Sequence, residues 1–435
     1  MIKPYISVVI GKGFGDEGKG MATDYLSSRY EKVLVVRHNG GAQSGHTVEL
    51  PDKRFVFHEL SSGSFRMADT FWADTYYPDL FKLGEEIEEF RGVISGGDVS
   101  ESESECDVEK VSQMPAIFAD INTQVTIIDD VLINMAAETM RGEERHGSCG
   151  MGIYEALCRG EAGYGITIGE LQELDFDALL ERLEEIRREY VPRRLSELGF
   201  DKAAVCKNSC KARDVSESYI EYLEMLEDRI VLENVARVML ENMSHVNPIE
   251  NVKELFNKYD SVIFENGQGL LLDTDNEEYS PHVTASKTGL YNPYMLLRKI
   301  GYSIHEVVYV TRTYVTRHGA GPLPNECDRR ELGIKELDIT NIHNPWQGSI
   351  RYARHNNIED FDNDIKADMK ILQEDEYPTK CMLMITHLDE TSGNVLCVSG
   401  NVEVEEFCKI FKRENEGVFD GYYLSWSRYG GVEIK

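Results

Sequence analysis

Short runs of apolar, often β-branched residues followed by glycine or polar residues recur along the chain. The first run, Ile6 to Ile10, ends in a glycine-rich loop that leads into an amphipathic stretch from Met21 to Tyr30. Such a run predicts a buried strand, and the amphipathic stretch predicts a helix. Further buried strands are expected at Lys32 to Arg37, Ser261 to Glu265, Val307 to Thr311 and Cys381 to Thr386. The chain therefore opens with a βαβ unit, whose crossover is expected to be right-handed.

Two long segments, Leu174 to Leu198 and Val215 to Met243, have the apolar spacing of helices and carry interleaved Glu and Arg. We interpret them as helices with solvated charged faces and no chemical role. The acidic, Ser-rich segment from Gly97 to Lys110 is interpreted as a surface loop. The pattern predicts an α/β fold: one P-loop-like domain over residues 1–435, with a central mostly parallel sheet, helices on both faces and a helical insertion at about 170–250.

The charge balance is strongly acidic, with 46 Lys and Arg against 77 Asp and Glu and a formal net charge of −31. Such a charge repels phosphate backbones and anionic lipid surfaces, which argues against nucleic-acid polymers and membranes as partners. Nine cysteines without a C-x-x-C pair signal neither a zinc site nor a disulfide framework. The short apolar stretches fit neither a signal peptide nor a membrane span, so we expect a cytoplasmic protein.

A phosphate-binding loop is predicted between the first strand and the first helix. GFGDEGKG, from Gly13 to Gly20, satisfies G-x-x-x-x-G-K, with Lys19 as a point charge and backbone N–H groups facing an anion. Gly20 stands where an ordinary nucleotide-hydrolysing loop has Ser or Thr to ligate Mg²⁺, so another group must hold the metal. Asp16 would be repelled by bound phosphates unless a divalent cation bridges them or its carboxylate does acid-base work.

Four ordered motifs extend over most of the chain. They read GKGFGDEGKG (Gly11 to Gly20), NGGAQSGHT (Asn39 to Thr47), FENGQGLLLDTD with HVTASKTG (Phe264 to Asp275 and His282 to Gly289), and VTRHGAGPLPNE (Val315 to Glu326). In this order they resemble the signatures of the adenylosuccinate synthetase family.

The resemblance implies a two-step ligation. A base removes the N1 proton of IMP, the 6-oxyanion attacks the γ-phosphate of GTP, and the amine of L-aspartate then displaces phosphate. By resemblance Asp16 is the base and a Mg²⁺ ligand, His46 the acid and Lys19 the phosphate-binding lysine of the catalytic set. The carbonyl of Gly45 matches a second ligand of the Mg²⁺ cofactor.

The resemblance also implies the nucleotide contacts. GTP is assigned to Gly15, Gly18, Lys19, Gly20, Gly45, Thr47, His387, Asp389 and Ser425. IMP is assigned to Asp16, Gln43, Ser148, Arg159, Gln268 and Thr284. Arg159 is expected to reach the substrate of a neighbouring subunit, which would require a homodimer.

Two loops depart from the family pattern. The guanine loop T-K-L-D becomes Thr386 to Asp389; Asp389 still favours guanine, whose adjacent N1–H and amine donate to a carboxylate, and ATP is the alternative donor. In the aspartate loop, Ser349 falls where the first arginine should be. The aspartate contacts are then Gly348, Ser349, Arg351 and Arg354, of which Arg354 comes from a shifted frame. Trp426, next to Ser425, either stacks on the nucleotide base or packs the last strand.

Three activities are compatible with these residues. The leading one makes adenylosuccinate from IMP, L-aspartate and GTP. The second is a phage-type 2-aminoadenylosuccinate synthetase acting on GMP or dGMP with ATP or GTP. In that relative the loop aspartate is replaced, so Asp16 favours IMP. The third is a non-catalytic nucleotide-binding paralogue, against which Asp16, Lys19 and His46 together argue, because binding alone would not require both a base and an acid.

Overall fold

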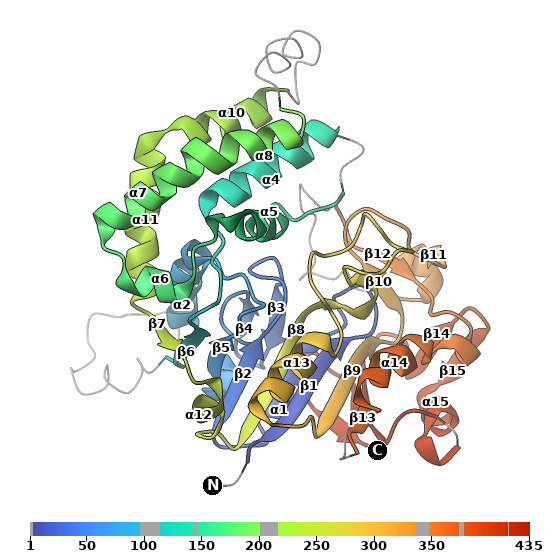
Figure 1. Ribbon diagram of the computed structural model, residues 1–435. Helices are drawn as coiled ribbons and strands as arrows, with labels where there is room; N and C mark the ends of the chain where they lie inside the picture. The colour runs from blue at the N-terminus through green and yellow to red at the C-terminus, as the bar shows by residue number, and fades with distance from the viewer. Residues whose placement is uncertain are drawn as a thin grey trace, which may run out of the picture.

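The computed structural model describes residues 3–95, 114–142, 146–200, 216–335, 348–373, 378–415 and 417–435. The acidic segment from Gly97 to Lys110 lies outside the described residues. Within them the chain forms a mixed α/β domain around one large sheet (Figure 1).

The central sheet has ten strands in the order β17-β16-β13-β9-β1-β8-β2-β5-β6-β7. Every neighbouring pair is parallel except β16 with β17, so the predicted mostly parallel sheet is confirmed. The strands are β1 (Tyr5–Gly11), β2 (Val33–Arg37), β5 (Asp69–Trp72), β6 (Ile117–Asp120), β7 (Val246–Ile249), β8 (Ser261–Gly269), β9 (Glu306–Arg312), β13 (Lys380–Thr386), β16 (Gly421–Ser425) and β17 (Val432–Ile434).

All five apolar runs expected to be strands are strands of this sheet, namely β1, β2, β8, β9 and β13. The two strands of the opening βαβ unit are not neighbours, because β8 lies between them. Phe264 of β8 pairs with Val8 on one side and Val36 on the other. The loops after β1, β2 and β8 therefore meet at one edge of the sheet, where open parallel sheets bind ligands.

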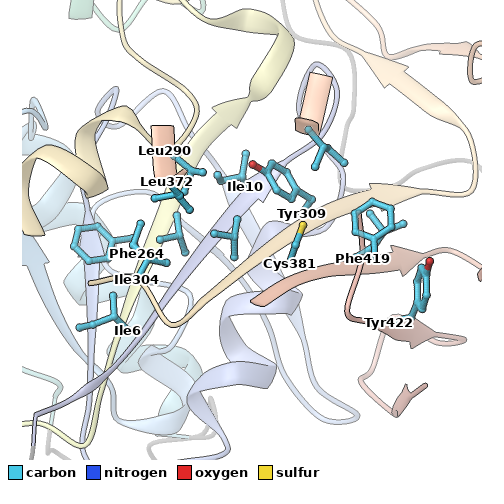
Figure 2. Packing of buried hydrophobic residues seen from close by; sticks show 14 of the residues in the cluster. Ile6, Ile10, Phe264, Leu290, Ile304, Tyr309, Leu372, Cys381, Phe419 and Tyr422 are labelled. Carbon is cyan, nitrogen blue, oxygen red and sulfur yellow. The ribbon is translucent and has the colours of Figure 1, made fainter. Parts of the chain in front are cut away.

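Helices cover both faces of the sheet. α1 (Lys19–Ser27) packs Ala22 and Leu26 on one face, against Val9 and Val35. The other face carries α12 (Val252–Phe256), α13 (Tyr291–Ile300), α14 (Asn363–Asp368) and α15 (Val404–Phe411). Figure 2 shows part of the apolar core on this face, including Ile6, Phe264 and Tyr309. Complete burial of a Leu, Ile or Phe side chain in this core stabilises the fold by about 1.5–3 kcal/mol relative to exposure of that side chain.

A helical layer packs at the β5 to β7 end of the sheet and shares one apolar cluster with it (Figure 1). Its helices are α2 (Leu80–Ile94), α4 (Ile128–Arg141), α5 (Ile153–Arg159), α6 (Ile168–Glu173), α7 (Phe176–Glu185), α8 (Val191–Glu197), α10 (Ser216–Glu227) and α11 (Arg229–Met243). A π-helical segment, Ile186–Tyr190, joins α7 to α8 within the first predicted helix. The second is divided at Asp228, whose carboxylate accepts from Ile230 N–H and starts α11.

Three small sheets follow the carboxyl ends of central strands. β3 (His46–Glu49) with β4 (Arg54–Phe57) follows β2, and β14 (Asn394–Cys397) with β15 (Gly400–Glu403) follows β13. β10 (Val315–Arg317), which follows β9, pairs through β12 (Arg351–Ala353) with β11 (Glu326–Cys327). Short helical turns lie at Ser64–Arg66, Gly160–Tyr164, Leu270–Leu272, Arg329–Leu332, Ile358–Asp360, Met369–Leu372 and Arg413–Asn415. None of the described helices is both long and apolar enough to cross a membrane.

Candidate active site

The loop between β1 and α1 has an unusual backbone. Gly15 and Gly18 adopt φ values of 105° and 99°, and Asp16 adopts 62°. Such left-handed conformations suit glycine but cost an ordinary L-residue on the order of 1 kcal/mol. The strained Asp16 is held in place by Arg312 of β9, whose Nε–H donates to the Asp16 carbonyl. The loop thus presents Asp16 at the carboxyl edge of the sheet with Lys19 starting α1.

The Glu17 carboxylate lies inside this loop. Its Oε1 accepts from Gly13 N–H at 3.0 Å and Gly15 N–H at 2.8 Å, and its Oε2 pairs with Lys19 Nζ at 2.7 Å. Burial raises the pKa of Glu17, but Lys19 and the backbone donors outweigh burial and hold the pKa below its ordinary value. The carboxylate is therefore ionised and is the anion that the loop contacts in this structure.

The glycine at position 20 has a steric reason. A Cβ at Gly20 would lie 2.9 Å from the Thr47 carbonyl oxygen and 3.2 Å from His46 Cβ. A serine or threonine would have to push β3 away from the start of α1. Gly20 therefore lets the His46 backbone approach the phosphate loop beside Lys19, in place of the usual metal-binding hydroxyl.

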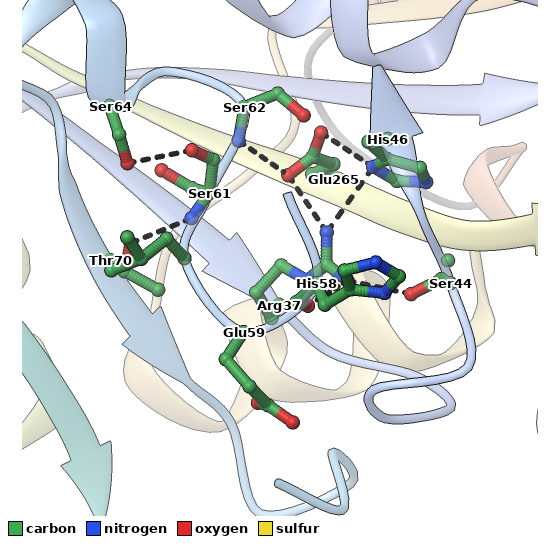
Figure 3. A network of polar contacts seen from close by, with 12 residues as sticks. Arg37, Ser44, His46, His58, Glu59, Ser61, Ser62, Ser64, Thr70 and Glu265 are labelled. Carbon is green, nitrogen blue, oxygen red and sulfur yellow. Dashed lines mark hydrogen bonds and ion pairs between the residues drawn. The ribbon is translucent and has the colours of Figure 1, made fainter. Parts of the chain in front are cut away.

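His46 belongs to a buried polar network (Figure 3). Its Nδ1 lies 2.8 Å from Glu265 Oε1, and Arg37 donates to Glu265 Oε2 at 3.1 Å. Arg37 ends β2 and faces Glu265 of β8 in the sheet register. Its other nitrogen donates to Ser44 Oγ at 2.6 Å, and the Ser62 N–H donates to the Glu265 carboxylate at 3.2 Å. Two neighbouring strands thus orient one imidazole.

The charges of this network fix the state of the His46 ring. Burial raises the pKa of Glu265, yet His46 and Arg37 outweigh burial and hold the pKa below its usual range, so the carboxylate is ionised. An ionised carboxylate only accepts, so Nδ1 carries the proton. Burial lowers the pKa of His46, with Glu265 opposing. Nε2 is buried and has no hydrogen-bond partner in the described part of the chain, which leaves it for a ligand.

Asp16 contacts a histidine of the loop that follows β10. His318 Nε2 lies 3.8 Å from Asp16 Oδ2, and the Asp16 side chain is 22% exposed. Burial raises the pKa of the Asp16 carboxyl, while His318 and Arg312 oppose the rise. A carboxyl with a raised pKa is a better proton acceptor than a surface carboxylate, as a general base requires.

The residues predicted to contact the monophosphate come from three loops. Gln43, after β2, has a buried side-chain oxygen with no hydrogen-bond partner among the described residues. Gln268 lies near the end of β8, and Thr284 donates its N–H to Leu272 O at 2.9 Å. Ser148 Oγ donates to Asn134 Oδ1 at 2.8 Å.

The loops that carry Ser148 and Thr284 contact each other, and the Ser148 loop also contacts a third loop. The His146 carbonyl lies 2.9 Å from His282 Nδ1, which joins the Ser148 loop to the Thr284 loop. A Cβ at Gly147 would lie 2.9 Å from Ala320 N, so the glycine-rich loop after β10 also reaches this place. The fold therefore brings the loop at Ser148, which is predicted to contact the monophosphate, next to the loop that carries Thr284.

Arg159 corrects the sequence prediction. Its side chain is 0% exposed and forms a bidentate ion pair with Asp130, with Nε to Oδ1 and NH2 to Oδ2 both at 2.9 Å. The remaining donors serve the carbonyls of Tyr164 and Val125. The prediction that Arg159 reaches the substrate of a neighbouring subunit is wrong, because this guanidinium is enclosed between α5 and α4.

The loops predicted to bind the nucleotide base adjoin the phosphate loop through β13. Thr386 Oγ1 donates to the Glu17 carbonyl at 2.8 Å. His387 follows it in a left-handed conformation with φ of 59°, and Asp389 is exposed. The end of β16 lies alongside, with Leu388 N–H donating to the carbonyl of Ser425 at 3.3 Å.

Trp426 lies over this base loop. Its ring is close enough to Gly393 that a Cβ there would lie 2.8 Å from it, yet the residue is 41% exposed. An indole packed into the last strand would be covered. The partly exposed indole is therefore more suited to stacking on a base than to packing against the last strand.

The predicted amino-acid loop does not converge in this structure. Arg351 pairs with Glu326 at 2.9 Å and donates to the Gly321 carbonyl at 2.7 Å. Arg354 instead donates to Asn401 Oδ1 at 2.9 Å, beside the β14 and β15 hairpin. Gly348 adopts φ of 79° and Ser349 is exposed. The two guanidinium groups thus contact different loops.

Four polar residues of the site were not singled out from the sequence. Arg37 and Glu265 each end an apolar run, KVLVVR and SVIFE, and a charged residue at the end of a buried strand is a usable signal. Glu17 lies inside the loop motif itself, and His318 lies inside VTRHGAGP. Only the folded chain shows that these side chains meet Lys19, His46 and Asp16.

Comparison with known proteins gives the same family. The family model described as "Adenylosuccinate synthetase" matches residues 8–338. The adenylosuccinate synthetase of Thermoplasma volcanium is 29% identical over 326 residues, which cover 74% of this chain and 64% of the relative. That of Clostridium botulinum is 29% identical over 341 residues, covering 73% and 65%. The matched part thus spans slightly less than two thirds of these relatives' length.

Two solved structures share the fold. A fully ligated adenylosuccinate synthetase from Plasmodium falciparum aligns with a TM-score of 0.59 at 19% identity, covering 92% of this chain and 83% of that one. The cyanophage S-2L succinoaminodeoxyadenylate synthetase, bound to dGMP and to dATP as an energy donor, aligns with a TM-score of 0.55 at 13% identity, covering 98% and 94%. With its phosphate loop, its His46 network and a family model matched over most of its length, this chain belongs to the adenylosuccinate synthetase family.

Proposed function

We propose that this chain is a ligase that joins L-aspartate to C6 of IMP, with GTP as phosphoryl donor. The observation that carries the proposal is the placement of the His46 network beside Lys19. Gly20 allows this approach, and Arg37 and Glu265 hold the ring so that Nε2 has no partner among the described residues. A site that only binds nucleotide has no need of a buried imidazole oriented in this way.

The residues divide the chemistry between them. Asp16 takes the N1 proton of IMP, and the resulting 6-oxyanion attacks the γ-phosphorus of GTP, which releases GDP. When the anionic phosphates bind, their charge adds to that of Glu265 and favours the His46 imidazolium. Its Nε2–H then donates to the transferred oxygens, and Lys19 offsets their negative charge. The aspartate amine then attacks C6 and displaces phosphate. The proton lost from the amine passes to water or to the departing phosphate.

Mg²⁺ is part of the proposal, and the donor set fits it. Magnesium prefers one or two carboxylates together with substrate phosphates, rather than a cage of protein ligands. No group of three metal-ligating side chains lies among the residues that the structure describes, so the substrate phosphates would have to supply the remaining ligands. Asp16 and the Gly45 carbonyl would hold the ion. When bound, Mg²⁺ neutralises phosphate charge during transfer.

Substrate choice follows from two carboxylates. The exposed Asp389 carboxylate suits the adjacent N1–H and amine donors of guanine, which favours GTP over ATP. The loop carboxylate of Asp16 favours IMP, which has no 2-amino group. L-aspartate is expected to engage Arg351 in exchange for Glu326, because a carboxylate of the substrate can replace the carboxylate of Glu326.

A homodimer stays a prediction that rests on family resemblance and is measured by sedimentation equilibrium.

A substrate panel tests the proposal. Phosphate release is measured while IMP, GMP and dGMP are crossed with GTP, ATP and dATP, with and without L-aspartate. Release should require IMP, GTP and aspartate together, and Asp16→Ala or His46→Asn should abolish it. Turnover only with dGMP and dATP would assign the cyanophage-type activity instead. Binding of nucleotides without turnover in any combination would contradict an enzymatic function.

A further inference from the structure

Three donors of the phosphate-binding loop already contact an anion in this structure. Phosphate loops hold an anion with inward-facing N–H groups and a lysine. Here Gly13 N–H, Gly15 N–H and Lys19 Nζ all contact the carboxylate of Glu17, at 3.0, 2.8 and 2.7 Å. A phosphate oxygen would need the same donors. One carboxylate therefore makes the contacts that a bound phosphate would make.

The fit of the carboxylate is close. Glu17 and Lys19 are both only 4% exposed, so the ion pair is enclosed. Beneath it lies Gly11, where a Cβ would be 2.2 Å from Glu17 Oε2. The bare backbone of Gly11 is what makes room for the carboxylate. A phosphate cannot join it there, because two anions in one enclosed place repel each other strongly.

We propose that Glu17 is an internal anion that fills the phosphate position of the loop, and that a nucleoside triphosphate binds only by displacing the Glu17 carboxylate. This inference rests on the proposed function of the loop. Its consequence is selectivity. A single inorganic phosphate gains only the contacts that Glu17 gives up, whereas a metal-bound triphosphate also gains contacts along its length and at its base. Glu17 thus keeps free phosphate, a reaction product, from occupying the loop.

The displaced carboxylate has a second cation within the same cavity. A cavity that is open to solvent is lined by Glu17, Lys12 and Asp364, among others. The Lys12 side chain is nine-tenths buried, and its Nζ lies 4.5 Å from the centre of the Phe361 ring. Burial lowers the pKa of Lys12, while Asp364 and Glu17 act against the fall. Moving Glu17 from Lys19 to Lys12 would keep its charge paired during nucleotide binding.

Phosphate affinity tests the displacement directly. Titration calorimetry with inorganic phosphate compares the full chain with Glu17→Gln and Glu17→Ala, each checked for an unchanged thermal unfolding midpoint. Both variants should bind phosphate at least 10-fold more tightly than the unaltered protein. Adding Lys19→Met should abolish that binding. Equal or weaker phosphate binding by both Glu17 variants would show that Glu17 supports the anion site instead of competing for it.

A double-mutant cycle tests the role of Lys12, with Mg²⁺–GTP as the ligand. Lys12→Met should weaken GTP binding at least 5-fold when Glu17 is present and leave it unchanged in the Glu17→Gln background. Lys366→Met, on α14 beside the cavity and 49% exposed, is the matched control and should have no effect in either background. Equal losses in both backgrounds would contradict the exchange. A GTP affinity that Lys19→Met leaves unchanged would instead contradict phosphate binding by this loop, and with it the proposed function.

Discussion

The imidazole of His46 and the carboxylate of Glu265 form one buried pair, with Nδ1 2.8 Å from Oε1, although 219 positions separate them in the chain. Arg37 contacts the same carboxylate from the neighbouring strand. This arrangement fixes the ring in one orientation and one tautomer before any substrate arrives. Nε2 is unpaired within the described part of the structure, and once protonated beside bound phosphates it is the kind of donor that stabilises charge developing in a transition state.

Replacing the carboxylate tests that role. Glu265→Gln keeps the shape of the side chain but removes the charge that orients His46, so kcat should fall about 100-fold, the lower range of a general acid's contribution. The KM for IMP should change little, since binding does not depend on the proton. Ser62→Ala is the control, because Ser62 contacts Glu265 through its backbone N–H, which alanine keeps. A kcat within twofold of the unaltered enzyme would remove Glu265 from the mechanism.

Gly20→Ala tests the close approach of β3 to the loop. The added methyl group would meet the Thr47 carbonyl at 2.9 Å and should lower the free energy of unfolding by about 1–3 kcal/mol, as overpacking does. Gly92→Ala makes the same change in α2, where a Cβ meets nothing within 4 Å, and should raise stability by up to about 1 kcal/mol. Urea unfolding measures both. Equal effects of the two changes would contradict the steric account of Gly20.

Five strands of the central sheet could be predicted because a parallel strand covered on both faces is a continuous apolar run. The remaining strands of the central sheet have five residues or fewer, and β7 (Val246–Ile249) even contains Pro248. The place of β8 between β1 and β2 is set by contacts between segments more than 220 positions apart. No local pattern carries that information.

For the site, the motifs predicted the loop, Lys19 and His46, because these residues lie close together in sequence with a recognisable spacing. Arg159 shows the limit. Its sequence context is that of a substrate-binding arginine, but its guanidinium pairs with Asp130 on α4, which lies 29 positions earlier in the chain. Partner choice between charged side chains depends on which helices pack together, so the ion pair is a property of the tertiary structure.

Arg159→Leu should therefore act on stability. Removing the guanidinium leaves Asp130 buried without its partner, which costs about 3–5 kcal/mol in the free energy of unfolding. Urea unfolding measures this loss. The KM for IMP of the folded fraction should be unchanged. An increase in that KM of more than tenfold, with stability retained, would restore the role in substrate binding that the structure removes.

Glu86 gives the stability a defined pH dependence. Burial raises the pKa of Glu86 from 4.5 to about 7, against its backbone N–H donors. The folded state therefore holds a proton that the unfolded state has lost between these values, so this contribution is present below pH 4.5 and is lost as the pH rises through 7.

The variant Glu86→Gln isolates the contribution. Relative to the unaltered protein, its free energy of unfolding should increase by roughly 3 kcal/mol between pH 5 and pH 8, because the amide stays neutral throughout. Glu85→Gln, 67% exposed on the same helix, is the control and should show a flat difference. A flat difference for Glu86→Gln as well would mean that the carboxyl is ionised in the fold.

The transfer of oxygen from substrate to phosphate tests the central claim most directly. IMP carrying ¹⁸O at position 6 is incubated with the enzyme, GTP and L-aspartate, and the released phosphate is analysed by mass spectrometry. Attack of the 6-oxyanion on GTP predicts one ¹⁸O atom in each phosphate released, in step with formation of the succinylated product. Unlabelled phosphate, formed by attack of water on GTP, would contradict the proposed function.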